Sequence, residues 1–312
     1  MSDLDVSICI PVYNETLALR DTILELKKAF DNLLYKYEII VIDDGSSDNC
    51  TQTISDLEVR IIRHKRNLGG GVARLTGIRF AKAPIVFQTD ADGTYPCDKV
   101  GQIMEQMRTA DMVIAARNRE SATDWQPLRI FMKWLLKRIA SILAGHEIPD
   151  LNSGMRVYNR KLGLRYAYLY PKGHSIMSTM TLAFLTDNLK VNFVEIDYRE
   201  RIGKSTFRPI QDTYNYLVTI IRTVVYFDPL RLLMPVSLFT LAVTIFFTLR
   251  DIILFQRVNS VTIIGWLTTL LVGILAILSD QFSRLSRQIA HITNDDTKYD
   301  NMVEEIFSWP KD

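Results

Sequence analysis

Two aspartates, Asp90 and Asp92, stand one residue apart at the end of an apolar run in the stretch "IVFQTDADGTYP". In an extended backbone, residues i and i+2 point the same way, so both carboxylates would aim at one point. Two like charges in that arrangement repel each other unless a cation lies between them. A hard divalent cation, completed by phosphate oxygens and water, meets this need. A solvated turn is the alternative, since Asp and Gly favour turns, but the preceding strand favours a metal site.

Two further aspartates, Asp43 and Asp44, follow another apolar run in "VIDDGSSDNCT", where Gly45 allows a sharp turn. Carboxylates suit a base N–H or ribose hydroxyls better than a phosphate, so the pattern favours the nucleoside half of a nucleotide. An ordinary turn explains the pair about equally well. The glycines of "RNLGGGVARLTG" lack the Gly-Lys-Ser/Thr ending of a nucleotide triphosphatase loop. They indicate a helix start with close backbone packing.

Short β-rich apolar runs alternate with helical patterns in the first part of the chain. Strands are predicted at residues 6–12, 37–44, 59–64, 85–90 and 111–116, and helices at 15–34 and 69–83. Strands that are apolar on both faces and alternate with helices predict an α/β fold. Its mostly parallel sheet would carry helices on both faces. Ligands bind beyond the carboxyl ends of such strands, which is where the aspartate motifs lie.

Two long runs near the C-terminus, residues 232–249 and 258–279, contain no charged residue. Each approaches the ~20 residues that a helix needs to cross a bilayer core. We therefore predict four parts of the chain. They are a cytosolic catalytic domain at 1–209, an amphipathic juxtamembrane helix at 210–230, a transmembrane hairpin at 231–283 with spans at about 232–255 and 259–280, and a cytosolic tail at 284–312.

The orientation of the hairpin follows from charge and from the N-terminus. Arg222 and Arg231 precede the first span, and Arg284 and Arg287 follow the second. Basic residues at both outer ends favour a cytosolic placement of those ends. The acidic start "MSDLD" lacks the basic, long apolar pattern of a signal peptide. We expect a multi-pass inner (plasma) membrane protein with its catalytic domain in the cytoplasm.

The overall composition excludes some partners. The 312 residues carry a formal charge of only +2, so there is no global field for nucleic-acid binding. The hydrophobic content of 48% is slightly high for a soluble protein. Cys9, Cys50 and Cys97 form no even, regularly spaced set, and no disulfide framework is expected.

Six motifs, taken in order, resemble those of the large inverting glycosyltransferase family 2 that includes dolichol-phosphate mannose synthase. They are "PVYNE", "DDGSSDNCT", "NLGGGVARLTG", "TDADGTYP", "DLNSGMRVYNR" and "YRERIGKST", running from about Pro11 to Ser205. The hairpin is similar to that of GtrB-type polyisoprenyl-phosphate glucosyltransferases. The ordered set is far more specific than any single motif. The resemblance implies a GT-A fold, a nucleotide-sugar donor, a divalent Mg²⁺ or Mn²⁺, and a lipid-phosphate acceptor.

The resemblance assigns residues of the donor site, each at the position that matches the family's motif. The nucleoside pocket would be lined by Pro11, Tyr13 and Glu15, with Asp43 on the base or ribose and Asp90 beside them. Asp90 and Asp92 would be the metal-binding Asp-x-Asp pair, with Asp92 the firmer ligand. Mannose synthases often have a glutamine ligand two residues further on. Thr94 stands there in this chain, and a water molecule would take that ligand's place.

Asp150, in "PDLNSG", occupies the family position usually assigned as the catalytic base, so the resemblance marks Asp150 and Asp92 as catalytic. A phosphate monoester has a second pKa near ~6 and is largely dianionic at neutral pH. A strong base is therefore less necessary, and Asp150 could act by positioning or electrostatics. We predict that Asp150→Asn loses less activity than Asp92→Asn.

The phosphate groups require cations. Arg201 and Lys204 in "RERIGKS" are candidates for the donor diphosphate, and Arg117 is the family-matched candidate for the acceptor phosphate. Arg129 and Lys133 lie in "PLRIFMKWLLKRIASIL", whose basic amphipathic pattern suits a helix at the bilayer interface. A packed surface helix explains that pattern equally well.

The expected reaction is transfer of a hexose, best guessed as glucose from UDP-glucose, onto undecaprenyl phosphate. The lipid-linked product would serve cell-envelope or O-antigen glycosylation. One alternative is a GDP-mannose:dolichol/polyprenyl-phosphate mannosyltransferase, and another is a membrane-tethered nucleotide-sugar-binding scaffold without catalysis. A processive polysaccharide synthase is disfavoured because no Gln-x-x-Arg-Trp motif is present. A homo-oligomer is expected, and a tetramer would fit bacterial relatives.

Overall fold

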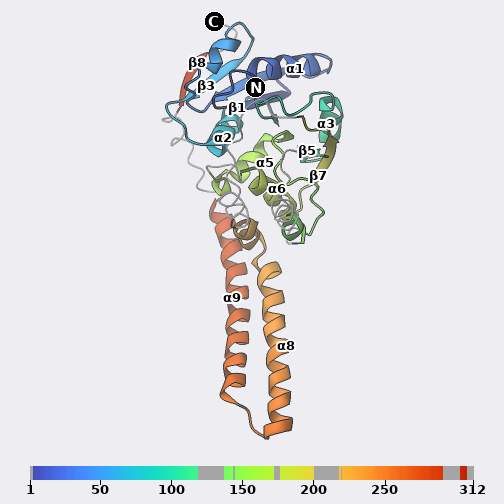
Figure 1. Ribbon diagram of the computed structural model, residues 1–312, viewed down its shortest axis with the longest axis vertical. Helices are drawn as coiled ribbons and strands as arrows, with labels where there is room; N and C mark the ends of the chain where they lie inside the picture. Colours follow the sequence, from blue (N-terminus) through green and yellow to red (C-terminus); the bar gives the residue numbers. More distant parts are fainter. Residues whose placement is uncertain are drawn as a thin grey trace.

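The computed structural model describes residues 3–118, 137–142, 145–171, 176–199, 218, 220–290 and 303–307. A head built from a sheet and its covering helices sits on a long helical hairpin, as Figure 1 shows. The head contains the predicted α/β pattern, and the hairpin is formed by the two predicted apolar runs.

Eight strands form one sheet in the described residues, in the order β7-β5-β6-β4-β1-β2-β3-β8. Their bounds are β1 Val6–Val12, β2 Tyr37–Asp43, β3 Arg60–His64, β4 Ile85–Gln88, β5 Met112–Arg117, β6 Arg156–Asn159, β7 Val191–Ile196 and β8 Val303–Phe307. Neighbours β1–β2, β1–β4, β2–β3 and β5–β7 are parallel, whereas β6 and β8 pair antiparallel. The prediction of a mostly parallel sheet is confirmed.

The central strands are apolar on both faces because each face has its own core. In β1, Ile8 and Ile10 belong to one hydrophobic cluster, while Cys9 between them belongs to the other. Helices cover both faces: α1 Leu19–Asp31, α2 Gly70–Phe80, α3 Val100–Met107, α5 Arg160–Arg165 and α6 Ile176–Thr186, with short 3₁₀ helices at Cys50–Ile54 and Ala167–Leu169. Alternate residues of a strand point to opposite faces, so two cores require the continuous apolar runs seen in the sequence.

Glycines act in the turn and the helix start as predicted. Gly45 has a φ of +73° directly after β2, a region that favours glycine. Gly69, with a φ of +97°, precedes the first residue of α2. Within α2, a Cβ on Gly77 would lie 3.0 Å from both Cys9 Cβ and Ile42 Cδ1. The missing side chain therefore lets α2 pack closely on β1 and β2.

The two C-terminal helices, α8 Pro229–Phe255 and α9 Ser260–Ala290, are each long and apolar enough to cross a membrane in the part of the chain described. Most of the apolar side chains along both helices are exposed. Asp228 caps α8 by accepting from the Arg231 N–H at 3.2 Å, and Pro229 stands at the first turn, where proline is tolerated. The second helix runs past residue 280, the predicted end of the second span.

Small residues bring the hairpin helices together. Gly265 of α9 lies against Thr244 of α8, and Gly273 lies against Ser237. The hydroxyl oxygens of Thr244 and Thr269 are 3.4 Å apart. Small residues spaced by four allow close approach of helices in a bilayer, where lipid supplies no hydrophobic drive between them.

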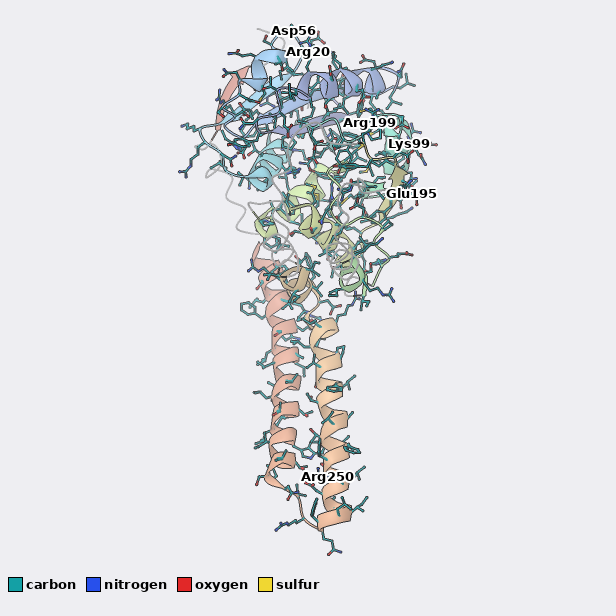
Figure 2. The ribbon with its side chains drawn as sticks, viewed as in Figure 1. Arg20, Asp56, Lys99, Glu195, Arg199 and Arg250 are labelled. Atoms are coloured by element: carbon teal, nitrogen blue, oxygen red, sulfur yellow. The ribbon has the colours of Figure 1, made fainter. Side chains whose placement is uncertain are left out.

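A polar connection closes the far end of the hairpin, where Figure 2 labels Arg250. The carboxylate of Asp251 is buried and accepts from the Thr262 hydroxyl at 2.6 Å and the Asn259 N–H at 3.0 Å. Arg250 pairs with the same carboxylate at 2.6 Å. One side chain thus joins the end of α8 to the start of α9.

An apolar cluster and a strand pairing, among the described residues, join the hairpin to the head. A small apolar cluster includes Ala140, Leu182, Ile220 and Val224, with Leu232 of α8 packed against it. The second connection is β8, which follows the hairpin and pairs with the edge strand β3. No strand was predicted in the tail at 284–312, because its pairing partner lies more than two hundred residues earlier in the sequence.

Candidate active site

The loops after β1 and β2 form one connected wall. The N–H of Asn14 donates to the Ser46 hydroxyl at 3.1 Å, and the N–H of Ser47 donates to Asn14 Oδ1 at 2.8 Å. The N–H of Thr16 donates to Asp48 Oδ2 at 3.1 Å. Adjacent parallel strands bring both loops to the same edge of the sheet, so the two motifs act as a single surface.

Asp43, a predicted nucleoside contact, lies at the end of β2. It is almost fully buried, accepts from the Ser46 N–H at 2.8 Å and lies 3.3 Å from Arg63 Nε. These contacts fix the carboxylate in a turn. The hydrogen bond from Ser46 is the one expected of an ordinary turn. A contact between Asp43 and a nucleotide remains a prediction.

Pro11, Tyr13 and Glu15 follow one another from the end of β1. Pro11 is half-buried in the strand, and the Tyr13 side chain is 44% exposed. The Glu15 carbonyl accepts from the N–H groups that begin the α1 region, including that of Leu19 at 3.1 Å. The structure therefore brings the predicted nucleoside residues to the same edge as Asp43.

Asp90 and Asp92 lie beyond β4, which ends at Gln88. The chain bends there, with Gly93 at a φ of +72°, so the argument from an extended backbone was wrong. Asp90 pairs with Arg74 of α2 at 2.5 Å. Both carboxylates remain at the carboxyl edge of the sheet, but they are held by different neighbours.

Thr94 orients the second carboxylate. Asp92 Oδ1 accepts from the Thr94 hydroxyl at 2.6 Å and from the Thr94 N–H at 3.2 Å. Both side chains are buried. Thr94, which stands where mannose synthases often have a glutamine, therefore donates to the Asp92 carboxylate.

Asp90 and Asp92 are the carboxylates at this edge that would hold a divalent cation, with the Asp90 carboxylate paired to Arg74 in this structure. No group of three His, Cys, Asp or Glu side chains gathers around a potential metal position in the described ranges. Asp90 and Asp92 supply hard oxygen donors, which suit Mg²⁺ or Mn²⁺. The remaining ligands would be phosphate oxygens of a donor and water.

Gly154 lets the "DLNSG" loop approach the Asp-x-Asp loop. A Cβ at this position would overlap the carboxylate of Asp90. The Gly154 N–H donates to the Tyr95 hydroxyl oxygen at 2.6 Å. The two motifs, more than fifty residues apart in sequence, are therefore in direct contact.

We expect Gly154→Ala to displace the Asp90 carboxylate and lower the sugar transfer that the family resemblance implies at least tenfold, because 1 Å misplacements at a site can cost ~100-fold. The measurement is kcat/KM for the donor together with the thermal unfolding midpoint. Gly101→Ala is the matched control, since a Cβ there meets only Leu33 Cδ2 at 3.7 Å. Wild-type transfer by Gly154→Ala would contradict this account of the contact.

Asp150 is held by Arg117. Arg117 Nε donates to Asp150 Oδ2 at 2.6 Å, and a second guanidinium nitrogen donates to Oδ1 at 2.9 Å. Burial alone would raise the pKa of the Asp150 carboxyl, but the charge and hydrogen bonds of Arg117 outweigh it and lower that pKa. A carboxylate with a lowered pKa is a weaker base, so the geometry favours positioning.

Arg156 supports the same loop from behind and was not predicted as a site residue. It is fully buried and donates to the Ser153 carbonyl at 2.6 Å, the Met177 carbonyl at 3.1 Å and the Thr181 hydroxyl at 3.1 Å. Burial lowers the pKa of its guanidinium to about 10. Three neutral acceptors thus hold a cation beneath the loop that carries Asp150.

Arg74 and Tyr95 were also missed, although both lie inside quoted motifs. Arg74 follows the glycines that were assigned to packing, and Tyr95 stands in "TDADGTYP". Spacing in sequence could not assign them partners, because Arg74 of α2 meets Asp90 in the following loop and Tyr95 meets Gly154 in a separate loop.

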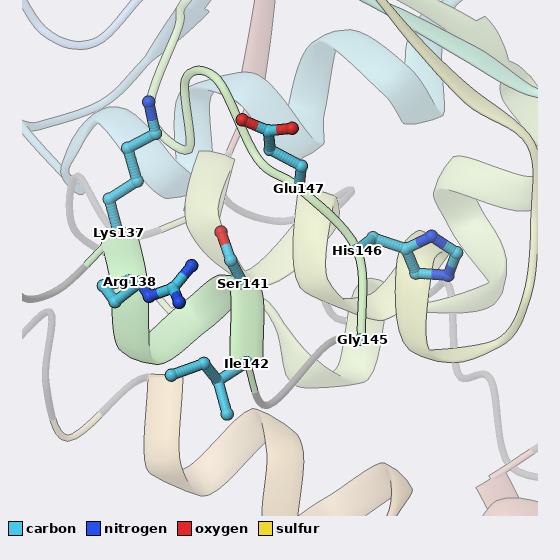
Figure 3. Close-up of a pocket in the computed structure, with 7 residues that line it drawn as sticks. All are labelled: Lys137, Arg138, Ser141, Ile142, Gly145, His146 and Glu147. Atoms are coloured by element: carbon cyan, nitrogen blue, oxygen red, sulfur yellow. The ribbon is translucent and has the colours of Figure 1, made fainter.

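Four predicted phosphate contacts, Arg129, Lys133, Arg201 and Lys204, lie outside the described residues. Part of the predicted amphipathic helix is described as the helical segment 137–142. Together with the loop after it, this segment lines a pocket of about 470 Å³, shown in Figure 3 with Lys137, Arg138, Ser141, Ile142, Gly145, His146 and Glu147.

The pocket lies near the start of α8. A Cβ on Gly145 would be 2.9 Å from a guanidinium nitrogen of Arg231. Lys137 and Arg138 therefore stand at the hairpin end of the head, the place predicted for cations that face the bilayer.

The comparisons with known proteins match this arrangement in two parts. The glycosyl transferase family 2 profile covers residues 7–163, and the GtrB C-terminal hairpin profile covers residues 228–285. The chain belongs to glycosyl transferase family 2. The family 2 match spans strands β1 to β6 and the Asp43, Asp90 and Asp150 motifs, and the hairpin match spans α8 and most of α9.

Several curated relatives of this family 2 transferase have names that give a polyprenyl phosphate as their substrate. The undecaprenyl-phosphate 4-deoxy-4-formamido-L-arabinose transferase of Pseudomonas fluorescens is 30% identical over 50% of this chain and 47% of its own length. The enzyme of that name from Proteus mirabilis is 28% identical over 74% and 71%. A dolichyl-phosphate beta-glucosyltransferase of Trichomonas vaginalis is 25% identical over 55% and 56%. The chain spans about half the length of several curated relatives that it matches.

Solved structures support the GT-A fold. Glucosyl-3-phosphoglycerate synthase from Mycobacterium tuberculosis, in complex with Mn²⁺, UDP-glucose and phosphoglyceric acid, has a TM-score of 0.56. It is 17% identical, covering 71% of this chain and 80% of that one. Mannosyl-3-phosphoglycerate synthase from Rubrobacter xylanophilus has a TM-score of 0.52 at 17% identity, over 71% and 72%.

Proposed function

We infer that this family 2 transferase moves a hexose from a nucleotide diphosphate donor to a polyprenyl phosphate in the membrane. The observation that carries the inference is the contact between the Asp-x-Asp loop and the "DLNSG" loop, at Gly154 and Tyr95. This contact joins the loop of Asp90 and Asp92 to the loop that carries Asp150. The apolar hairpin on the same chain suits an acceptor that lives in a bilayer.

In the proposed reaction, an oxygen of the acceptor phosphate attacks the anomeric carbon. The bond from that carbon to the donor diphosphate breaks, and the nucleoside diphosphate leaves with the electron pair. The sugar thereby inverts at the anomeric carbon. Because a phosphate dianion carries no proton that must be removed, Asp150 is not required as a base.

The chain's own residues would divide the remaining tasks. Asp90 and Asp92 would hold Mg²⁺ or Mn²⁺, which stabilises the charge that develops on a departing diphosphate. Arg117 would bind the acceptor phosphate, and Asp150 would fix the guanidinium in place. Fixed cations suit developing negative charge without reorganisation. Arg129, Lys133, Arg201 and Lys204 stay proposals for further phosphate contacts.

The preferred donor and acceptor are UDP-glucose and undecaprenyl phosphate. The names of relatives support the acceptor class more firmly than the sugar, since they include formamido-arabinose, glucose and mannose transfer. GDP-mannose with a dolichol-type or other polyprenyl phosphate is the second candidate. A screen of purified full-length protein with radiolabelled sugar nucleotides and polyprenyl phosphate tests this. Binding of a donor without any lipid labelling would favour the scaffold alternative.

We propose an inner-membrane protein whose catalytic domain faces the cytoplasm, as the basic residues at both outer ends of the hairpin favour. Because β8 follows α9 and pairs with β3 of the head, both outer ends of the hairpin would lie on one side of a bilayer. A chain that crosses the bilayer twice returns to the side on which it began, as this arrangement requires. We also propose the division of the chain into catalytic, juxtamembrane, hairpin and tail segments. The assembly that we propose is a homo-oligomer, such as a tetramer.

A fragment that ends at Asp228 is expected to bind the donor nucleotide but to glycosylate long lipids at least about tenfold less than short, water-soluble polyprenyl phosphates. The reason is that α8 and α9 would hold the site against the leaflet. Initial rates on both acceptors measure the effect. Removal of residues 303–312 alone is the control for the loss of β8. Full activity of the fragment on a long-chain acceptor would refute the role of the hairpin.

A further inference from the structure

Strand β3 ends in two consecutive residues, Arg63 and His64, at the edge of the sheet where the predicted nucleoside residues lie. The strand lies between β2 and β8 in the sheet (Figure 1). Arg63 is the register partner of Asp43 at the end of β2. Because consecutive residues of a strand point to opposite faces, Arg63 and His64 can reach the neighbouring pair Asp43 and Asp44 over different faces of the sheet.

Arg63 fixes the turn that follows β2. Its Nε lies 3.3 Å from Asp43 Oδ2, and another of its guanidinium nitrogens donates to the Ser46 carbonyl at 2.9 Å. The Ser46 N–H donates to the second oxygen of Asp43 at 2.8 Å. The Asp43 carboxylate is almost fully buried, whereas the Arg63 side chain is half-buried. One guanidinium therefore holds both ends of the turn from Asp43 to Ser46.

His64 holds the next carboxylate, Asp44. Both side chains are buried, and His64 Nδ1 lies 2.6 Å from Asp44 Oδ1. The other ring nitrogen, Nε2, lies 2.9 Å from the hydroxyl oxygen of Thr76 on α2. The imidazole therefore joins Asp44 to the helix that follows β3.

Asp44 in turn holds the loop between β3 and α2. Its two oxygens accept from the Leu68 N–H at 2.9 Å and from the Gly69 N–H at 2.8 Å. The same loop packs on the backbone of the turn after β2, where a Cβ on Gly45 would lie 2.7 Å from the carbonyl carbon of Arg66. A shift of this loop would therefore move the turn.

We propose that Arg63 and His64 are positioning residues for the nucleoside half of the donor. Arg63 fixes the Asp43 carboxylate directly, and His64 fixes the loop behind the turn through Asp44. The proposal rests on the proposed function, because it takes Asp43 as a contact of the bound nucleotide. Neither residue has to touch the donor, so their removal should weaken nucleotide binding without changing the use of the acceptor.

Arg63→Ala tests the first contact in full-length protein, with UDP and GDP as probes in the presence of Mn²⁺. Isothermal titration calorimetry should show about tenfold weaker binding of the nucleotide that the wild-type protein binds, the size of a lost hydrogen bond to a charged group. In the Asp43→Ala background the same substitution should change the affinity by less than about twofold, because Arg63 acts through that carboxylate. Arg60→Ala is the matched control and should keep the wild-type affinity, since Arg60 stands at the other end of β3 and donates to the Phe80 carbonyl at 2.9 Å.

Two substitutions of His64 separate positioning from stability. In His64→Asn the amide replaces Nδ1 and keeps the contact with Asp44, whereas in His64→Gln it replaces Nε2 and keeps the contact with Thr76. Each variant loses one buried contact, so the two should have similar thermal unfolding midpoints. His64→Gln should weaken nucleotide binding about tenfold, and His64→Asn should stay within about threefold of the wild-type protein. The acceptor KM, measured by lipid labelling, should remain within about twofold in both variants.

Wild-type nucleotide affinity in Arg63→Ala and His64→Gln would overturn the positioning role and leave the proposed function intact. Equal losses in His64→Asn and His64→Gln, or an undiminished effect of Arg63→Ala in the Asp43→Ala background, would also overturn it. A wild-type protein that binds neither UDP nor GDP with Mn²⁺ would overturn the proposed function as well. If Asp43→Ala fails to fold, the two His64 variants still decide the question.

Discussion

Asp92→Asn is expected to lower sugar transfer by at least about 100-fold. Loss of a metal ligand should exceed the 10–100-fold cost typical of losing an outer-shell partner. The asparagine keeps the size of the side chain and can still accept from Thr94, so the fold should survive. Initial rates over a range of Mg²⁺ and Mn²⁺ concentrations, with donor binding measured separately, give the size of the effect.

Asp150→Asn should lose less, because the proposed step needs no proton transfer and the amide oxygen can still accept from Arg117. Asp56→Asn is the control. Its carboxylate pairs with Arg20 on the exposed end of the head, where Figure 2 labels both residues, and such surface pairs contribute little. Comparable losses in turnover for Asp92→Asn and Asp150→Asn, with intact donor binding, would contradict this ranking.

Arg117→Ala should have the largest effect on the acceptor, raising its KM or lowering kcat/KM by about 100-fold, while donor binding changes little. A charge-assisted contact between the guanidinium and the acceptor phosphate would explain the size. Arg117→Lys should recover only part of the activity, since lysine keeps the charge but loses the planar fork. Acceptor kinetics at saturating donor measure both variants.

Folding must be separated from binding in this experiment. Arg117→Ala leaves the buried Asp150 carboxylate without its cation, which can cost about 3–5 kcal/mol. Adding Asp150→Asn removes that unpaired charge. The double variant should therefore regain thermal stability without regaining acceptor use. A loss confined to the donor KM would contradict the assignment of Arg117 to the acceptor.

The sequence predicted the elements whose signals are local. Strands β1 and β2 are buried on both faces, so their continuous apolar runs are visible without a structure. The runs that form α8 and α9 are equally plain. In contrast, β6 has only four residues and begins with Arg156, whose buried guanidinium depends on the Met177 carbonyl of α6 and on the Ser153 carbonyl. The strand β8 depends on a partner from the other end of the chain.

The site divides in the same way. Asp43 and Asp92 could be found because carboxylates that follow apolar strands form recognisable motifs, and Asp150 was found through the family resemblance of "DLNSG". The contacts of Arg74 and Tyr95 could not, because the first joins helix α2 to the Asp-x-Asp loop and the second joins that loop to the "DLNSG" loop. Their residue types alone suit an exposed cation or a core aromatic equally well.

The most direct test is lipid labelling by the purified full-length chain, with undecaprenyl phosphate and a panel of radiolabelled nucleotide sugars. We expect at least one sugar to reach the lipid when Mg²⁺ or Mn²⁺ is present. Labelling should disappear with a chelator and return when Mn²⁺ is added back. Labelling that persists unchanged in chelator, or bound donors that never label lipid, would contradict metal-assisted transfer to a polyprenyl phosphate.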